Sequence, residues 1–310
     1  NPELIRFSES FHSQKYQQNP KFIVGSGPYL VESWEPRQQI VLTRKGNWWA
    51  DELMDTEEAL HAYPAKIIYK FILDPVTALE AIKTFKIDIV RGVMPKKFKE
   101  LEIQPEIKQH YHLSNPPTFS YYYLGMNMRP SPERKPIFTS QKVRRAMAHL
   151  VDVDRIIDKL YYGLAQRTVG PVFPMHQDAY NTQLEFIPFD IQKAAELLQQ
   201  DGWKDSNNNG ILDKYSDGEI IEFEFDLLVP TGREITKNVA LILGQDAQQI
   251  GIKVNVLELD ESSYLKAVTS RDFDMYFGGW IGSPAPPDLK QIWSTESWIE
   301  HGSNYVGFGT

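Results

Sequence analysis

Apolar and polar positions form their clearest pattern in the last third of the chain, where strand-length apolar runs are separated by helix-length amphipathic segments. The pattern predicts strands over 220–229, 252–259 and 273–280, joined by helices over 234–251 and 261–270. Helix-length crossovers between apolar strands are typical of parallel strands in an α/β sheet. We therefore expect a sheet flanked by helices in this region.

The first hundred residues predict a mixed arrangement of strands and helices. Strands over 29–34 and 39–44 flank a short loop and should form a hairpin. A strand over 66–73 leads to Asp74, which is placed to cap a helix, and a strand over 87–90 would then complete a βαβ unit. The apolar residues expected on the buried face of this helix are Val76, Leu79, Ile82 and Phe85.

The clearest break in the chain is Ser114-Asn115-Pro116-Pro117, where two prolines prevent a helix from crossing and suit a linker or hinge. A strand is predicted over 118–128. Helices are predicted over 141–150, from Asp152 to Gly163, and between Asp190 and Gly202. The first of these helices should bury Val143, Ala146, Met147 and Leu150.

Composition narrows the classes of protein that the chain can represent. Its 310 residues carry a net charge of −8, which argues against a nucleic-acid-binding protein with a clustered basic face. The hydrophobic content of 42% is ordinary for a globular protein, and no apolar run is long enough to cross a bilayer. The chain has no cysteine, which excludes disulfides, thiolate metal sites and cysteine nucleophiles.

The two ends of the sequence differ from typical natural termini. Residues 1–6 lack the basic start and apolar centre of a signal peptide. Residues 304–310 form an apolar, strand-like run, whereas termini are usually polar. We therefore expect this sequence to be a piece of a longer protein.

The last predicted strand ends in Gly278-Gly279-Trp280-Ile281-Gly282 and is followed by a proline-rich segment that can be neither helix nor central strand. Open α/β sheets bind ligands beyond the carboxyl ends of their strands. No nucleophile or base stands beside Trp280, so we expect this residue to line a binding cleft rather than to take part in catalysis. The alternative is that the indole simply closes the end of the sheet.

Aromatic residues alternate along the strand that follows the break. Phe119, Tyr121 and Tyr123 share one face, and Tyr122 lies on the other. Tyrosine combines an apolar ring with a polar tip, which suits a wet cleft. Core packing, the usual role of aromatic residues in strands, is the alternative.

One loop resembles a calcium-binding loop. Asp205, Asn207 and Asn209 occupy its first, third and fifth positions, and the required glycine follows as Gly210. Ser216 stands at the twelfth position, so the bidentate glutamate is missing. A turn rich in asparagine and glycine explains these residues equally well.

The rest of the sequence shows no complete set of catalytic or metal-ligating residues. A hydrolase would need a nucleophile, a base and an orienting acid that converge at the strand ends, and we find no such set. His110 and His112 alternate on a predicted strand and would share a face, but no third ligand lies near them in the sequence. We predict no catalytic residue, no metal ion and no cofactor.

Four segments carry a family resemblance by their order and their spread over most of the chain. They are GSGPYLVESWEPRQQIVLTRKGNWWA, KVRRAMAHLVDVDRIIDKLYYGLA, FDIQKAAELLQQDGW and QQIGIKVNVLELD. In this order they resemble the family 5 extracellular solute-binding proteins, the peptide-, dipeptide- and nickel-binding receptors of ABC importers. FDMYFGGWIGSPAPPD followed by GSNYVGFG is most similar to the YejA-type oligopeptide (microcin C) receptors.

The resemblance implies an α/β fold of the type II periplasmic-binding-protein class, with a mixed sheet flanked by helices in each of two lobes. Residues 1–117 would be part of the first lobe and residues 118–310 an incomplete second lobe. The lobes would close over a ligand by a hinge motion. Family members are considerably longer, which agrees with a sequence truncated at both ends.

The resemblance also implies site residues. In peptide-binding members a Gly-Trp pair at this strand end lines the cleft, and an aspartate three residues later receives the amino group of the peptide. Gly279 and Trp280 match, but Ser283 replaces the aspartate and supplies no charge, which puts a free peptide amine in doubt. Family receptors place main-chain and aromatic contacts after the hinge, here at Tyr121, Tyr122 and Tyr123.

We therefore expect a non-enzymatic substrate-binding receptor of an ABC importer, with oligopeptides as its ligands. It would work as a monomer in the periplasm or on the outer face of the cytoplasmic membrane, either free or lipid-anchored, and deliver its ligand to a membrane permease. A receptor for another small molecule, such as a metal chelate or an oligosaccharide, is the main alternative. An α/β hydrolase is a weaker one.

Overall fold

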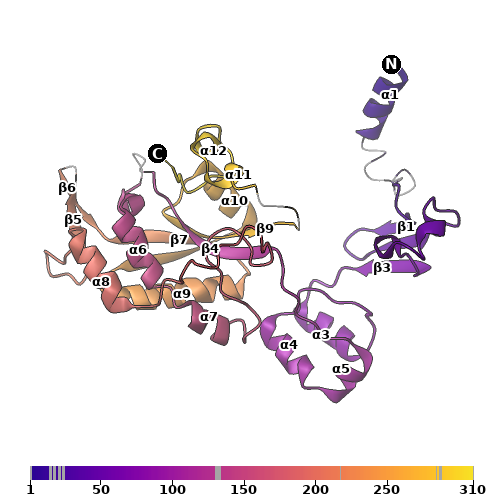
Figure 1. Cartoon of the computed structure of the whole chain (residues 1–310), viewed down its shortest axis with the longest axis horizontal. Helices are drawn as coiled ribbons and strands as arrows, with labels where there is room; N and C mark the ends of the chain where they lie inside the picture. Colours follow the sequence, from indigo (N-terminus) through magenta and orange to yellow (C-terminus); the bar gives the residue numbers. More distant parts are fainter. Residues whose placement is uncertain are drawn as a thin grey trace. The chain divides into compact units, whose positions relative to one another are not determined.

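The computed structural model describes residues 2–13, 16, 19, 22, 25–129, 134–216, 218–283, 285 and 288–309. The chain divides into two compact units, Asn1–Arg91 and Gly92–Thr310. Figure 1 labels their helices and strands. The proline-rich segment expected after residue 283 lies mostly outside the described residues.

The first unit is built on a three-stranded antiparallel sheet. Strands β1 (Tyr29–Glu35), β2 (Gln39–Arg44) and β3 (Lys66–Lys70) lie in this order, so the predicted hairpin is confirmed. In the described part of this unit lie the α-helices α1 (Pro2–Phe11) and α3 (Pro75–Lys83), and two short 3-10 helices, η2 (Asp51–Leu53) and η3 (Glu58–Leu60), follow β2.

Helix α3 begins as predicted but buries less than its sequence pattern suggests. The Asp74 carboxylate accepts a hydrogen bond from the Thr77 backbone N–H at 2.7 Å, which confirms the cap. Ile82 is buried, whereas Val76 is 68% exposed and Phe85 lies beyond the helix end. The strand predicted over 87–90 was wrong, because that segment pairs with no described strand and Ile89 is 80% exposed.

The second unit contains a four-stranded sheet in the order β4-β9-β7-β8. Its strands are β4 (Ser120–Met126), β7 (Glu224–Pro230), β8 (Lys253–Leu259) and β9 (Met275–Ile281). β7 runs parallel to both β8 and β9, as the crossovers predicted, and β4 pairs antiparallel with β9. The strand predicted over 220–229 is interrupted at Phe223, and its first part is β6 (Glu219–Glu222), which pairs with β5 (Asp213–Ser216) in a separate two-stranded sheet.

Helices cover both faces of the four-stranded sheet (Figure 1). The helices in the described part of the second unit, whether or not they contact this sheet, are α4 (Pro95–Glu102), α5 (Pro105–His110), η4 (Ile137–Thr139), α6 (Gln141–His149), α7 (Val153–Lys159), α8 (Ile191–Gln200), α9 (Glu234–Gln248), α10 (Glu261–Ser270), α11 (Lys290–Trp293) and α12 (Thr295–Ile299). The predicted buried face of α6 is confirmed, because Val143, Ala146, Met147 and Leu150 are all buried.

The histidine pair does not share a strand face, so that prediction was wrong. His110 ends α5, and His112 follows in an irregular segment. Pro105 occupies the first turn of this helix, where its fixed backbone angle favours helix formation.

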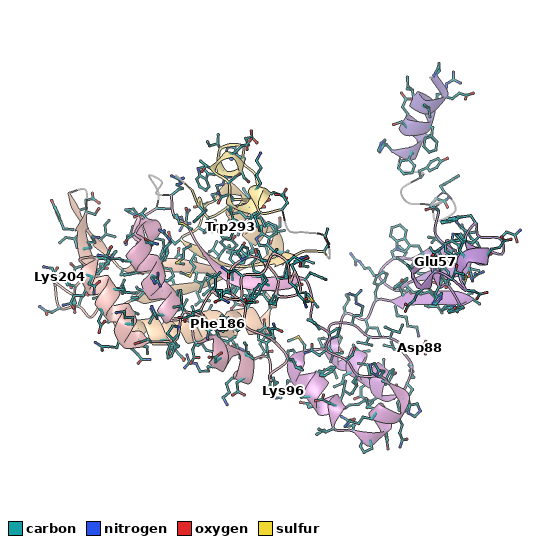
Figure 2. All side chains as sticks on the ribbon, viewed as in Figure 1. Glu57, Asp88, Lys96, Phe186, Lys204 and Trp293 are labelled. Carbon is teal, nitrogen blue, oxygen red and sulfur yellow. The ribbon has the colours of Figure 1, made fainter. Side chains whose placement is uncertain are left out.

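The core of the second unit lies on the two faces of β7. Phe225, Leu227 and Val229 belong to a cluster that includes residues of α6, α8 and α9, whereas Leu228 packs with Tyr264 of α10. This alternation follows from the two-residue period of a strand. Side chains fill the space between the sheet and its helices (Figure 2). β4 is an edge strand, because it stands first in the strand order.

Candidate functional site

The carboxyl end of β9 is shaped by glycines that allow tyrosines to pack against the backbone. A Cβ on Gly278 would lie 2.6 Å from the Tyr276 ring and 2.7 Å from the Tyr123 ring. A Cβ on Gly279 would lie 2.7 Å from the Tyr122 ring. Any larger residue at these positions would collide with rings of β4 or β9, so the Gly-Gly sequence has a local packing reason.

Trp280 follows these glycines and lies directly opposite Tyr121 in the β4–β9 register. Its indole is half-buried and parallel to the Tyr305 ring, with the centroids 6.3 Å apart and an interplanar angle of 7°. The Trp280 Nε1 atom is buried and lies near the Tyr123 hydroxyl, but it has no partner among the described residues with hydrogen-bond geometry. Ser283 is exposed, and its hydroxyl accepts a hydrogen bond from the Ala285 backbone N–H at 3.2 Å.

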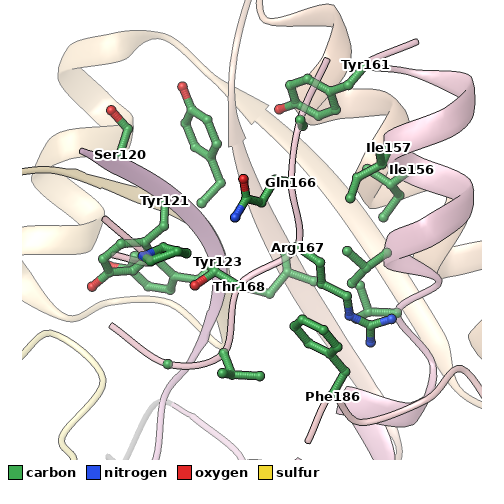
Figure 3. A pocket seen from close by; sticks show the side chains of 18 of the residues that line it. Ser120, Tyr121, Tyr123, Ile156, Ile157, Tyr161, Gln166, Arg167, Thr168 and Phe186 are labelled. Carbon is green, nitrogen blue, oxygen red and sulfur yellow. The ribbon is translucent and has the colours of Figure 1, made fainter. Parts of the chain in front are cut away.

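A pocket of about 970 Å³ lies beside β4, entirely within the second unit (Figure 3). Its walls come from β4, from α7 and from the segments 163–170 and 184–187. Tyr121, Tyr122 and Tyr123 line it, whereas Gly279, Trp280 and Ser283 are not among its lining residues. The structure thus gathers the three tyrosines around one pocket and places Trp280 at the adjoining strand end; their roles in ligand binding stay predictions.

The tyrosines of β4 differ in their hydrogen bonding. The hydroxyls of Tyr123 and Tyr276 lie 2.6 Å apart, and their rings meet edge to face. Tyr121 packs against Phe173 at 5.5 Å between centroids, and its buried hydroxyl has no partner among the described residues. Burial raises the pKa of the Tyr121 hydroxyl above an ordinary value that already lies well above neutral pH, so the group is protonated and can donate a hydrogen bond.

Several pocket residues gave no signal in the sequence. Thr168 lines the pocket, and its buried hydroxyl has no partner among the described residues. Arg167 is engaged, because its guanidinium pairs with Asp154 at 3.2 Å, donates to the Ile187 carbonyl and stacks over the Phe186 ring at 4.8 Å. Gly163 and Gly170 flank this segment, and both adopt a positive φ in the structure.

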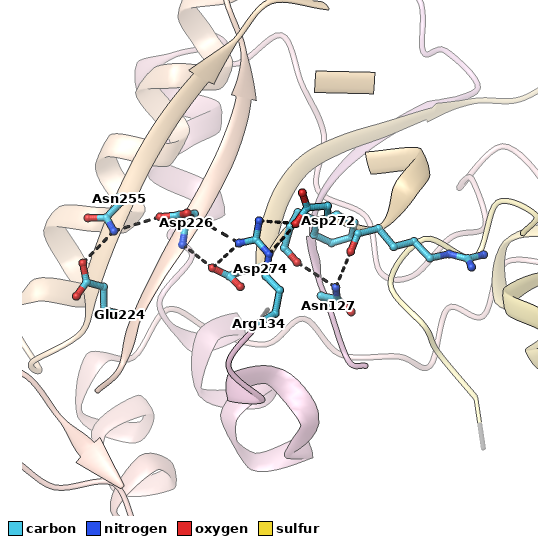
Figure 4. A network of polar contacts seen from close by, with 9 residues as sticks. Asn127, Arg134, Glu224, Asp226, Asn255, Asp272 and Asp274 are labelled. Atoms are coloured by element: carbon cyan, nitrogen blue, oxygen red, sulfur yellow. Dashed lines mark hydrogen bonds and ion pairs between the residues drawn. The ribbon is translucent and has the colours of Figure 1, made fainter. Parts of the chain in front are cut away.

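A separate polar network lies at the amino ends of β7, β8 and β9 (Figure 4). Arg134 donates to Asp272 at 2.9 Å, pairs with Asp274 at 3.2 Å and approaches Asp226 at 3.9 Å. The Asp226 backbone N–H donates to Asp274 at 3.0 Å, and Asn255 donates to the Asp226 carboxylate at 3.2 Å. Burial alone would lower the pKa of Arg134, but the neighbouring carboxylates outweigh it and raise the pKa, so the cation is held firmly.

In the loop that resembles a calcium site, side-chain oxygens accept hydrogen bonds from backbone N–H groups of the same loop. The Asp205 carboxylate accepts the backbone N–H groups of Asn209 and Gly210 at 3.1 and 3.0 Å, and the Asn207 side chain accepts from Asn209 at 3.0 Å. These bonds fit the interpretation as a turn. Among the described residues, no group of three His, Asp or Glu side chains could hold a metal ion.

No helix in the described part of the chain is long and apolar enough to cross a membrane.

Comparisons with known proteins give a consistent family assignment. The family model described as bacterial extracellular solute-binding proteins, family 5 Middle, matches residues 2–298. Oligopeptide-binding protein AppA of Bacillus subtilis (strain 168) is 27% identical over 299 residues, which cover 94% of this chain and 49% of AppA. The nickel-binding periplasmic protein of Escherichia coli (strain K12) is 26% identical, with coverage of 92% and 51%. YejA of the same strain is 24% identical, with coverage of 94% and 54%.

The structure of AppA from Bacillus subtilis in complex with a nonapeptide superimposes with a TM-score of 0.66 at 25% identity, covering 96% of this chain and 55% of AppA. The expected fold, an α/β type II periplasmic-binding-protein class, is confirmed. The chain spans about half the length of the curated relatives that it matches. YejA is one relative among several, so the predicted YejA-type subgroup stays a prediction.

Proposed function

Because the chain belongs to the bacterial extracellular solute-binding proteins of family 5, we propose that it is part of a substrate-binding receptor of an ABC importer. The family match over residues 2–298 is the observation that carries this proposal. The receptor binds its ligand without chemical conversion, works in the periplasm or at the outer face of the cytoplasmic membrane, and passes the ligand to a permease. It acts as a monomer, either free or held at the membrane by a lipid anchor.

Oligopeptides are the ligand class that we propose. AppA, whose structure was determined with a nonapeptide, supports this choice by its similarity over nearly the whole chain. The nickel-binding relative favours a metal chelate as the second candidate. Ser283 bears on the choice, because it cannot offer the charge that a free amino group prefers.

The binding surface that we propose is formed by Trp280 with Gly279 and Ser283 at the end of β9, and by Tyr121, Tyr122 and Tyr123 of β4. The Trp280 Nε1 atom and the Tyr121 hydroxyl support it, because both are buried donors without a protein partner in the described chain. A ligand that supplies acceptors removes the cost of leaving them unpaired. Residues 1–117 and 118–310 would belong to lobes that close by a hinge, with the ligand stabilising the closed state through its higher affinity for it.

Native mass spectrometry of the complete receptor, purified from its own periplasm, tests this function. We expect co-purified peptides that are released on denaturation and rebind to the refolded protein. A metal chelate in their place would establish the second candidate. Turnover of peptide, ester or glycoside substrates by the purified protein would overturn the receptor function.

A further inference from the structure

We propose that Asn209 is a site of spontaneous covalent modification, at which the folded loop converts the asparagine to aspartate and isoaspartate. The site lies in the loop that joins α8 to β5 (Figure 1), and none of its residues lines the pocket beside β4. Asn209-Gly210 is the one place in the sequence where glycine follows asparagine. The reaction needs only the residues around this loop and water, so it does not rest on the proposed function.

The reaction begins with an attack of the backbone on the neighbouring side chain. The Gly210 nitrogen forms a bond to the Asn209 Cγ atom and gives up its proton. The Asn209 Nδ2 atom takes up a proton and leaves as ammonia, and a five-membered succinimide remains. Water then adds to either carbonyl of the succinimide and opens the ring, which yields aspartate or isoaspartate. Glycine favours the attack, because it has no Cβ to obstruct the approach of its nitrogen.

Each of the groups that react is already hydrogen-bonded to a group that can assist it. The Gly210 N–H donates to the Asp205 carboxylate at 3.0 Å, so a proton acceptor faces the attacking nitrogen. The Ile211 backbone N–H donates to the Asn209 Oδ1 atom at 2.8 Å, where negative charge develops as Cγ becomes tetrahedral. The Asn209 Nδ2 atom donates to the Glu222 carboxylate at 2.7 Å, which fixes the orientation of the amide.

The backbone of the loop holds these groups in place. Gly210 has a φ of 84°, which a residue with a side chain rarely adopts. The Asp205 carboxylate also accepts the Asn209 N–H at 3.1 Å, and the Leu212 N–H donates to the Gly251 carbonyl at 2.7 Å, so the loop is anchored on both sides of the reacting pair. Groups held in this way need little further ordering before they react. Asn209 and Gly210 are exposed, so water reaches them.

The product changes both the charge and the backbone of the loop. Aspartate at position 209 cannot donate a hydrogen bond to Glu222, and its negative charge stands beside that of Glu222. Isoaspartate also places its Cβ atom in the main chain, which moves the Gly210 N–H away from Asp205. The modified protein should therefore melt at a lower temperature than the unmodified protein.

Peptide mapping by mass spectrometry tests the inference. Trypsin cleaves after Lys204 and Lys214, and each conversion replaces an amide NH2 by OH, which raises the mass of the released segment. The folded protein is incubated in a mildly alkaline buffer beside a synthetic peptide of the sequence 205–214. We expect Asn209 to convert in the folded protein at least as fast as in the peptide. Slower conversion in the folded protein would show that the loop protects the asparagine, which overturns the inference.

The same tryptic segment contains an internal control. Asn207 and Asn208 are exposed but are followed by asparagine, whose side chain obstructs the attacking nitrogen, so both should remain unconverted while Asn209 reacts. Fragmentation that cleaves the N–Cα bonds locates the converted residue and separates isoaspartate from aspartate. Equal conversion of all three asparagines would mean that neither Gly210 nor the contacts of Asn209 matter, which would also overturn the inference.

Two substitutions test the contacts of the reacting groups. Asp205→Asn removes the carboxylate that faces Gly210 and should slow conversion in the folded protein by about tenfold or more, whereas the same change in the peptide should have little effect. Glu222→Ala frees the Asn209 amide and should slow conversion by about threefold. Asp178→Asn is the matched control, because Asp178 is exposed and lies outside the loop. Unchanged or faster conversion in both folded variants overturns the inference, and the receptor function stands in either case.

Discussion

The two ends of the second-unit sheet differ in how their polar groups are paired. At the amino ends, Arg134 is surrounded by carboxylates that are themselves hydrogen-bonded. At the carboxyl end of β9 and the adjoining pocket, three donors are buried without a described partner: Tyr121 Oη, Thr168 Oγ1 and Trp280 Nε1. An unsatisfied buried polar group costs about 1–3 kcal/mol. We infer that the amino-end network stabilises the fold, whereas the opposite end keeps donors available for a ligand.

Arg134→Ala should have the largest effect, and it should disrupt only the polar network at the amino ends of the strands. Removing the guanidinium leaves Asp272 and Asp274 without their cation, and we expect the free energy of unfolding to fall by about 2 kcal/mol. Urea denaturation measures the change, and ligand affinity should remain unaltered. Arg233→Ala is the control, because its pair with Glu261 is exposed and should contribute less than about 1 kcal/mol. Equal losses for the two variants would contradict the special role of Arg134.

Trp280→Ala should lower the ligand affinity of the complete receptor and leave its stability nearly unchanged. We expect ligand affinity to fall by about tenfold, because an aromatic face and an unpaired donor are lost, while the melting temperature changes little. Isothermal titration calorimetry measures the affinity. Trp49→Ala is a suitable control, because Trp49 is 67% exposed in the first unit. Unchanged affinity in Trp280→Ala would remove this residue from the site.

Two tyrosine substitutions compare a paired hydroxyl with an unpaired one. Tyr276→Phe should destabilise the protein by about 1 kcal/mol, because it leaves the Tyr123 hydroxyl without its partner. Tyr121→Phe should leave the stability of the free protein unchanged or raise it by up to about 1 kcal/mol, because it removes a hydroxyl that has no partner. Thermal denaturation of the two variants gives the comparison. A loss of stability in Tyr121→Phe as large as that in Tyr276→Phe would contradict it.

The loop around Asp213 should show the smallest effect, seen as a dependence on pH. The Ser206 hydroxyl and backbone N–H donate to the Asp213 carboxylate and hold its pKa below the ordinary value. A depressed pKa contributes stability above the unfolded value of about 4, and this stability is lost as the pH falls through the folded pKa. Asp213→Asn should therefore lower the melting temperature at pH 7 and converge with the unmodified protein in acid. A difference that does not depend on pH would contradict the role of the charge.

The sequence predicted those features of the fold that depend on local chemistry. Asp74, Asp152 and Asp190 each accept a backbone N–H at a helix start, as their positions indicated. The parallel strands followed from helix-length crossovers between β7, β8 and β9. Such signals lie within a few residues of each other and do not depend on distant parts of the chain.

Features that need a distant partner were harder to predict. Residues 87–90 have the composition of a strand but join none of the described sheets. Trp280 and Tyr121 were candidates from the sequence, and the β4–β9 register places them opposite each other. The pocket beside them was not predicted, because the fold brings Thr168 to β4 from a loop without a strong sequence signal.

A crystal structure of the complete receptor with its co-purified ligand tests the central claim most directly, since it locates the ligand relative to the two ends of this sheet. We expect ligand atoms within hydrogen-bond distance of Trp280 Nε1 or the Tyr121 hydroxyl, and an unchanged Arg134 network. A ligand bound elsewhere, with these donors satisfied by other parts of the same protein, would contradict the account.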